Sequence, residues 1–123
     1  MLAAMSWGGM SVKSVIWVKG HLRLCNAMGL PAMLVKRGAE EAGSVYVKIN
    51  RLDGRVLLMG PAPGPAYDEL GRRRWTRLLA GGEVPEVEAE TYLERLRAVD
   101  PDIWIIEIED AASLGLLDLE GAS

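Results

Sequence analysis

The chain has 123 residues, half of them hydrophobic and a quarter charged, a composition typical of a single folded domain. Its net charge of −3 argues against a dedicated nucleic-acid binder, which usually carries a basic excess. One cysteine and one histidine exclude an internal disulfide and a Cys/His zinc set, and they favour a reducing, cytoplasmic location. No stretch approaches the ~18–20 apolar residues of a membrane span, so no membrane partner is expected.

The expected organisation is a flexible N-terminal tail over residues 1–10, one α+β domain over residues 11–119, and a frayed C-terminus over residues 120–123. The first ten residues have neither the basic start nor the apolar stretch of a signal peptide. The translation start stays open among three methionines: Met1, Met5 and Met10.

Helical spacing of apolar residues predicts a first amphipathic helix over residues 14–28. Gly29 suits the position after its end, and Pro31 cannot continue it. Val12, Ser14, Ile16 and Val18 also alternate with their neighbours, so a strand over residues 12–18 is the alternative. The stripe expected to face the core, with its flanks, is Val15, Val18, Leu22, Cys25, Trp17, His21, Leu24 and Met28.

A short strand over residues 32–36 and a central hairpin over residues 45–60 follow. Asp53-Gly54 suits a two-residue type I′ turn, which would place Leu52 opposite Arg55 and Ile49 opposite Leu58. Because side chains alternate along a strand, one face of the hairpin would belong to the core and would carry Val45, Val47, Ile49, Val56 and Leu58. The other face, open to solvent or to a site, would carry Tyr46, Lys48, Asn50, Arg55 and Leu57.

The C-terminal half contains one clear helix and one clear strand. Three prolines over residues 61–65 end the hairpin, and residues 66–82 lack a regular pattern, with a short strand or helical turn as options at residues 75–79. A helix over residues 85–99 buries Ala89, Tyr92, Leu93, Leu96 and Val99. A strand over residues 103–109 and a short edge strand over residues 114–119 complete the chain.

The absence of alternating β-α-β units indicates an α+β fold. We expect a mainly antiparallel four- to five-stranded sheet with two helices packed on one face.

Three stretches carry a family resemblance: Asn50-Arg51-Leu52-Asp53-Gly54, Gly60-Pro61-Ala62-Pro63-Gly64, and Asp100-Pro101-Asp102-Ile103-Trp104 with Glu107-Ile108-Glu109-Asp110. Together with Trp17-Val18 and Arg37-Gly38, they make most of the chain resemble a family of small bacterial proteins catalogued as a domain of unknown function. One departure is Ala111-Ala112-Ser113, where that family often has a polar Asp-Gly turn. The resemblance implies no activity, cofactor or catalytic residue.

Arg72-Arg73-Arg74-Trp75 has the composition of an anion-binding or nucleic-acid-binding surface, with guanidiniums for phosphate and an indole for stacking. The structural alternative, which we favour, makes Trp75 an anchor for a long loop. In that case the arginines are solvated or paired with Asp68 and Glu69.

The acidic end of the last clear strand is the second candidate. Glu107 and Glu109 share a face and, with Asp110 and Asp53, could supply oxygen ligands to Mg²⁺ or Ca²⁺. We favour a solvated strand end, or salt bridges to Lys48 or Arg51, and predict no metal. His21 and Cys25 have ligand spacing but lack further ligands, so core packing is the better interpretation.

Two functions are compatible with these patterns. The favoured one is a non-catalytic interaction or adaptor module with a protein partner and no cofactor. The alternative is a small acidic-site, metal-dependent enzyme using Glu107, Glu109, Asp53 and Lys48. The candidate binding residues are Lys48, Asn50, Arg51, Asp53, Arg72, Arg73, Arg74, Trp75, Glu107 and Glu109.

Overall fold

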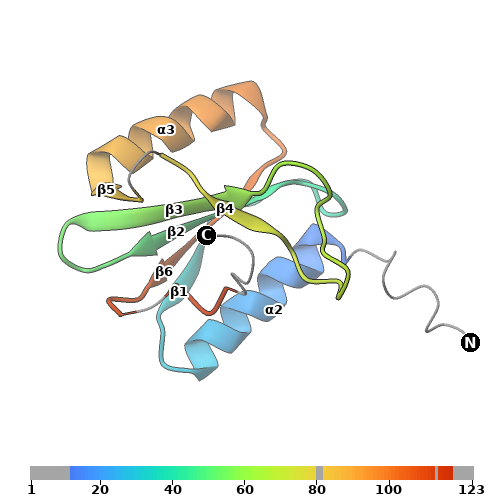
Figure 1. The fold of residues 1–123 in the computed structure, drawn as a ribbon, viewed down its shortest axis with the longest axis horizontal. Helices are drawn as coiled ribbons and strands as arrows, with labels where there is room; N and C mark the ends of the chain where they lie inside the picture. The colour runs from blue at the N-terminus through green and yellow to red at the C-terminus, as the bar shows by residue number, and fades with distance from the viewer. Residues whose placement is uncertain (1–11, 80–81, 113, 118–123) are drawn as a thin grey trace, which may run out of the picture.

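The structure, a computed structural model, describes residues 12–79, 82–112 and 114–117. Its elements in chain order (Figure 1) are α2 (Ser14–Ala27), β1 (Ala32–Lys36), β2 (Val45–Asn50), β3 (Arg55–Pro61), β4 (Trp75–Arg77), β5 (Glu83–Pro85), α3 (Glu86–Val99) and β6 (Trp104–Glu109). No described helix is long and apolar enough to cross a membrane.

The strands form one six-stranded sheet in the order β1-β6-β2-β3-β4, with β5 pairing to another part of β3. Only β2 and β6 run parallel, and every other pair is antiparallel. The α+β class and the mainly antiparallel sheet are therefore confirmed. The strand count exceeds the four to five expected because β4 and β5 are three-residue strands. Strand β4 lies where the sequence left a short strand as one option, whereas β5 was not predicted.

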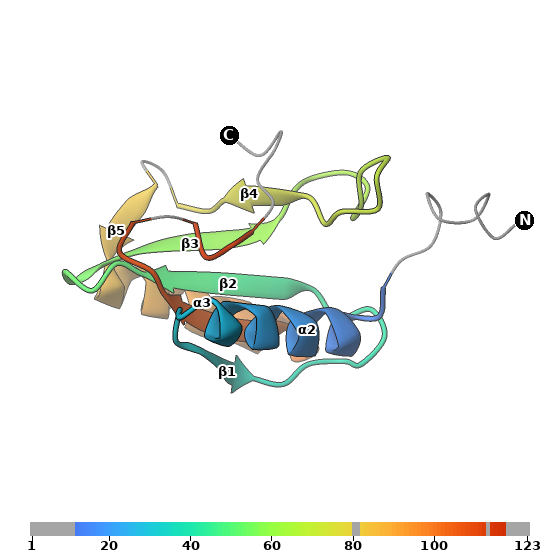
Figure 2. The ribbon, with the colours of Figure 1, turned by 90° about the horizontal axis from the view of Figure 1, so that it is seen from below.

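The two helices pack on opposite faces of the sheet (Figures 1 and 2). On one face, α2 contributes Val18 and Cys25 to a core that includes the odd-numbered residues of β2. On the other face, Leu93 of α3 packs with Leu58 and Ile105. The prediction that both helices share one face is wrong. The central strands are apolar on both sides, so each side needs a covering helix.

The β2–β3 hairpin differs from the prediction by one residue. Ile49 faces Leu57 rather than Leu58. The loop consists of residues 52–54 and is closed by the Arg51 N–H donating to the Arg55 carbonyl at 3.0 Å. Because a one-residue shift turns every side chain to the other face, Leu57 and Met59 join the α2 side, and Val56 and Leu58 lie on the α3 side.

The loop is stabilised by two side chains that imitate a backbone turn. Asn50 Oδ1 accepts the Leu52 N–H at 2.8 Å, and Asp53 Oδ1 accepts the Arg55 N–H at 3.0 Å. Positive φ occurs at Leu52 (66°) and Gly54 (88°), whereas the type I′ turn would have placed it at Asp53 and Gly54.

Both predicted helices form, and the strand alternative for residues 12–18 is excluded by α2. The helix α2 ends one residue before the predicted Met28, and α3 begins directly after Pro85. Three residues assigned to the buried stripes are exposed: Leu24, Met28 and Val99.

The C-terminal segment packs on α2 without forming the expected edge strand over its described residues, 114–117. The Gly115 carbonyl accepts a hydrogen bond from His21 Nε2 at 2.8 Å and one from Cys25 Sγ at 3.6 Å. Residues 118 and 119 of that predicted strand, the predicted tail over 1–10 and the predicted frayed end over 120–123 lie outside the described residues.

Candidate functional site

The loop between β1 and β2 forms one wall of the candidate site by holding the start of α2. The helix has no side-chain cap, and its first N–H groups donate to carbonyls of this loop: Ser14 to Glu41 at 3.0 Å and Val15 to Glu40 at 2.9 Å. Ser14 Oγ donates to the Gly43 carbonyl at 2.6 Å. A side chain at Gly43 would collide with the Asp102 carbonyl, so the loop backbone needs glycine to pack this closely.

The long loop between β3 and β4 forms the opposite wall and uses two of its three arginines internally. Arg74 Nη1 donates to the carbonyls of Pro63 at 2.7 Å and Pro65 at 2.8 Å. Arg72 Nε donates to Asp68 Oδ2 at 2.9 Å, as the pairing alternative predicted. Trp75 is 3% exposed, as expected of a loop anchor, and its ring lies 5.3 Å from that of Trp17.

Arg73 stands apart from its neighbours. Its guanidinium lies over two aromatic rings, 5.4 Å from that of Trp17 and 5.3 Å from that of Tyr67. Its Nη2 donates to Ser14 Oγ at 3.2 Å, whereas its buried Nε has no hydrogen-bond partner among the described residues. No described carboxylate forms a salt bridge with it. Burial lowers the pKa of the Arg73 side chain, because it disfavours the charged form.

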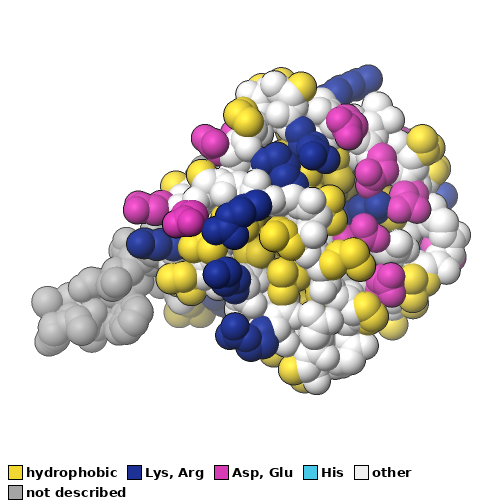
Figure 3. All heavy atoms as spheres, turned by 180° about the vertical axis from the view of Figure 1, so that it is seen from behind, with side chains coloured by type: hydrophobic (Ala, Val, Ile, Leu, Met, Phe, Trp, Pro, Cys, Tyr) yellow, Lys and Arg dark blue, Asp and Glu magenta, His cyan; other side chains and the backbone are white. Residues whose placement is uncertain are grey.

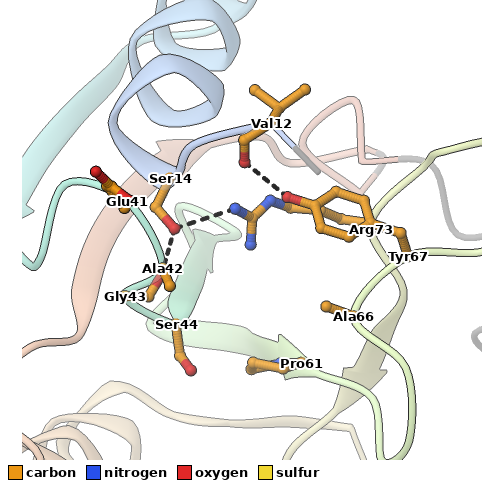
Figure 4. Close-up of a pocket in the computed structure, with 10 residues that line it drawn as sticks. All are labelled: Val12, Ser14, Glu41, Ala42, Gly43, Ser44, Pro61, Ala66, Tyr67 and Arg73. Carbon is orange, nitrogen blue, oxygen red and sulfur yellow. Dashed lines mark hydrogen bonds between the residues drawn. The ribbon is translucent and has the colours of Figure 1, made fainter. Parts of the chain in front are cut away.

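The guanidinium of Arg73 enters a pocket of about 230 Å³ between these two walls (Figure 4). The terminal nitrogen that is not bonded to Ser14 points into the open space, and Glu41 lies beyond Ser14, away from the guanidinium. The lining residues are Val12, Ser14, Glu41, Ala42, Gly43, Ser44, Pro61, Ala66, Tyr67 and Arg73.

Lys48 lies on the other face of the sheet, among carboxylates. It is 4% exposed, and its Nζ lies 2.6 Å from Glu86 Oε2, 2.7 Å from Glu90 Oε2 and 3.6 Å from Glu107 Oε1. Burial is the largest single influence on the Lys48 pKa and by itself would lower it. The three carboxylates together outweigh burial and raise the pKa above its ordinary value. Lys48 is therefore a charged, fully paired structural cation at neutral pH.

The other predicted polar residues on this side also have structural partners. Asn50 Nδ2 donates to Glu107 Oε2 at 3.1 Å. Arg51 bonds Glu83 Oε2 at 3.0 Å and the Asp110 carbonyl at 3.1 Å.

The structure brings Lys48 and Glu107 together, while Asp53 bonds within the hairpin loop and Glu109 lies half-buried at the end of β6. Within the described part of the chain, no three His, Cys, Asp or Glu residues are arranged to hold a metal ion. His21 and Cys25 are buried against Gly115. This is a core environment, as the favoured interpretation of these two residues predicted.

Three residues of the Arg73 environment were not selected from the sequence: Ser14, Trp17 and Tyr67. Trp17 was assigned to the flank of the core stripe, and Tyr67 lies in a stretch without a regular pattern. No local signal connects residues so far apart in the chain. Only an arginine-rich segment next to a tryptophan pointed to this region.

Comparison with known proteins identifies relatives along nearly the whole chain. The family model described as "Protein of unknown function (DUF1491)" matches residues 12–118. The crystal structure of a DUF1491 family protein from Caulobacter crescentus is 30% identical, with a TM-score of 0.72, and the match covers 88% of this chain and 94% of that one. The solution structure of Atu0922 from A. tumefaciens is 36% identical, with a TM-score of 0.73, and the match covers 93% of this chain and 100% of that one.

No curated protein matches this chain. The resemblance inferred from the motifs is confirmed: the chain belongs to the DUF1491 family of proteins of unknown function.

Proposed function

We propose that this protein is a non-catalytic interaction module that takes one carboxylate of a protein partner into the Arg73 pocket. The observation that supports this proposal is a half-buried guanidinium that faces a pocket and has no carboxylate partner among the described residues. Removing a charge from water costs free energy unless it is paired, and a guanidinium pairs well with a planar carboxylate.

A carboxylate fits the pocket better than a phosphate dianion does. Arg73 supplies a single positive charge, because Arg72 is paired with Asp68 and Arg74 is bonded to loop carbonyls. Glu41 among the lining residues and the net charge of −3 add repulsion that grows with the charge of the ligand. One negative charge therefore matches Arg73, the one Lys or Arg side chain among the residues that line the pocket.

The pocket's own hydroxyl groups favour binding over chemistry. A hydroxyl nucleophile needs an adjacent base to take its proton. Ser14 Oγ donates to the Gly43 carbonyl, and Tyr67 Oη donates to the Val12 carbonyl at 2.8 Å. These two hydroxyls donate to backbone oxygens, so neither is a free donor for a ligand. The remaining side-chain donors of the lining are the hydroxyl of Ser44 and the guanidinium of Arg73.

The test is a titration of ¹⁵N-labelled protein with N-acetylglycine, followed in every variant through the backbone amide resonances of the lining residues Gly43, Ser44 and Tyr67 and, where Arg73 is present, also through its Nε–H resonance. We expect a saturable shift with N-acetylglycine and none with N-acetylglycinamide, which lacks the charge. Arg73→Gln should abolish saturable binding, whereas Arg77→Gln, at an exposed arginine two residues beyond Trp75, should preserve it.

Inorganic phosphate distinguishes the two anion classes in the same experiment. Tighter saturable binding of phosphate than of N-acetylglycine would overturn the choice of a carboxylate. No saturable response to either anion would overturn the pocket as a binding site. Capture of a cellular protein partner should likewise be lost in Arg73→Gln and retained in Arg77→Gln.

A further inference from the structure

A second hollow, of about 260 Å³, lies beside the Arg73 pocket. Three residues line both of them: Val12, Tyr67 and Arg73. Figure 4 shows the Tyr67 hydroxyl reaching the Val12 carbonyl next to the Arg73 side chain, a hydrogen bond of 2.8 Å. These three residues therefore form the boundary between the two hollows, and a group bound at Arg73 lies next to the second one.

The rest of the second hollow is lined mainly by aromatic and aliphatic side chains, among them Trp17, Trp75 and Leu116. The two indole rings lie 5.3 Å apart and are tilted by 50° to each other. Leu116 is 36% exposed, so part of this apolar lining is open to water. Apolar surface that water can reach favours contact with an apolar group of a ligand.

The polar side chains of this hollow have partners within the fold. His21 Nε2 bonds the Gly115 carbonyl at 2.8 Å, and burial lowers the pKa of His21, which keeps its ring neutral at neutral pH. Arg72 Nε donates to Asp68 Oδ2 at 2.9 Å. The second hollow therefore suits an uncharged group better than a second carboxylate.

A carboxylate alone would be a weak anchor for a protein partner. One charge-assisted hydrogen-bonded pair contributes only a modest net free energy, well below what a stable complex requires. The residues that dominate protein interfaces are most often tryptophan, tyrosine and arginine, clustered in pockets where they contact the partner closely. Trp17, Tyr67, Arg73 and Trp75 form a cluster of this composition.

Exposed apolar side chains also occur elsewhere on the molecule. Figure 3, which views it from behind, shows a hydrophobic area with a column of Lys and Arg side chains on one side and mainly Asp and Glu side chains on the other. The second hollow differs from that area because it shares lining residues with the Arg73 pocket. The guanidinium therefore specifies which chemical group accompanies the apolar one.

We propose that the partner segment bound at Arg73 carries a large apolar side chain next to its carboxylate, and that this side chain enters the second hollow. The inference rests on the proposed function and names the kind of segment that fits it. The guanidinium carbon of Arg73 lies 5.4 Å from the Trp17 ring, and one extended residue spans at most ~3.6 Å. The apolar side chain therefore belongs to the residue that carries the carboxylate or to its neighbour.

Titrations of ¹⁵N-labelled protein with matched pairs of probes test this inference. N-acetylleucine is compared with N-acetylglycine for a terminal carboxylate, and N-acetylglutamylleucinamide with N-acetylglutamylglycinamide for a side-chain carboxylate. Because a leucine side chain leaves water in the second hollow, we expect the leucine probe of one pair to bind about tenfold more tightly or better. That pair identifies the source of the carboxylate.

The resonances that shift locate each probe. Both members of the productive pair should shift the backbone amide of Gly43, which lines the Arg73 pocket. Only the leucine probe should also shift the backbone amide of Gly71, which lines the second hollow and not the Arg73 pocket.

Leu116→Asn replaces an apolar lining residue by a polar one that tolerates the left-handed backbone of this position, at φ 59°. It should reduce the advantage of the leucine probe and leave binding of the glycine probe unchanged. Leu70→Asn, at an exposed leucine that lines neither hollow, is the matched control and should keep the full advantage.

The outcomes separate this inference from the proposed function. If the glycine probes bind saturably and neither leucine probe binds more tightly, the inference is overturned while the carboxylate site stands. If no probe binds, the proposed function itself fails. Equal binding of N-acetylleucine and N-acetylleucinamide would also overturn the inference, because the apolar group would then bind without a carboxylate at Arg73.

Discussion

Lys48 and Arg73 are both cations with restricted access to solvent, and their surroundings differ in one respect. Lys48 lies against three carboxylates from α3 and β6. Arg73 lies against two aromatic rings and a hydroxyl. The first charge is neutralised within the fold, whereas the contacts of the second are cation–π contacts and a hydrogen bond to a neutral hydroxyl. A paired interior cation is part of the architecture, whereas the cation beside the pocket, without a carboxylate partner among the described residues, is the basis of the anion site that we propose.

Trp75→Ala should have the largest effect, because this buried indole fixes the platform on which Arg73 rests. Loss of a fully buried tryptophan side chain should lower the free energy of unfolding by about 3–5 kcal/mol. Urea denaturation measures the change. Arg77→Ala, an exposed position on the same strand, should change it by less than about 0.5 kcal/mol. Near-wild-type stability of the alanine variant at Trp75 would show that the loop is not anchored there.

Replacing each cation by methionine compares the two sites directly. Lys48→Met removes the partner of three carboxylates. Because Glu86 and Glu90 are 48% and 53% exposed and can hydrate, we expect a loss of about 1–3 kcal/mol rather than the full cost of a buried unpaired ion. Arg73→Met leaves no carboxylate unpaired, so its free energy of unfolding should stay within about 1 kcal/mol of the wild-type value. Equal losses, measured by urea denaturation, would remove the distinction between the two cations.

The hairpin loop sets the register that directs Lys48 toward α3, and Gly54 has the larger of the two positive φ angles in this loop. Gly54→Val should cost about 1 kcal/mol or more, because a β-branched residue is strained at φ 88°. Leu52→Gly is the matched opposite change, because it removes the strain of a leucine at φ 66°. It should leave the stability unchanged or increase it. Thermal denaturation of both variants checks the loop. A Gly54→Val variant with the melting temperature of the wild type would contradict this loop conformation.

The raised pKa of Lys48 predicts a specific loss of stability in alkali. A group whose pKa is higher in the folded state contributes all of its stability below the unfolded pKa, about 10.4 for lysine, and loses it as pH rises through the folded pKa. The difference in unfolding free energy between wild type and Lys48→Met should therefore be constant near neutral pH and shrink above about pH 10.4. A pH-independent difference would indicate that packing, and not charge, is what Lys48 contributes.

Divalent cations should have the smallest effect. No three described His, Cys, Asp or Glu residues are arranged to hold a metal ion, and Glu86, Glu90 and Glu107 lie around the ammonium of Lys48. Millimolar Mg²⁺ or Ca²⁺ should leave the melting temperature unchanged, since a ligand stabilises only the state it binds. A saturable increase that disappears in Glu107→Gln would restore the metal hypothesis.

Apolar patterns located both helices and the strands β1, β2, β3 and β6, together with turn and end signals such as Asp53-Gly54, Gly29 and Pro85. The hairpin register was missed for a local reason. Leucine is an unexpected residue at positive φ, so Asp53-Gly54 was assigned to a two-residue turn, and the slip exchanged the faces of residues 56–59. The placement of the helices was missed because alternation indicates which residues share a face, but not which helix covers it.

The candidate site was only partly accessible from the sequence. Arg73 could be named as a candidate, and so could the anchoring role of Trp75. The separation of Arg73 from Arg72 and Arg74 could not, because it depends on Ser14, Trp17 and Tyr67 converging from distant segments. The carboxylates around Lys48 likewise come from α3 and β6, which no sequence spacing relates.

The position of β6 between β1 and β2 has a consequence for biosynthesis. As the nascent chain leaves the ribosome, β2 and β3 can pair as soon as both have emerged, but β1 has no strand partner until Glu109 has been translated. For most of its synthesis the chain therefore presents two unsatisfied strand edges, which are prone to aggregate. Completion of the sheet is coupled to the arrival of the last strand, so a chain terminated before β6 would lack the central partner of both β1 and β2.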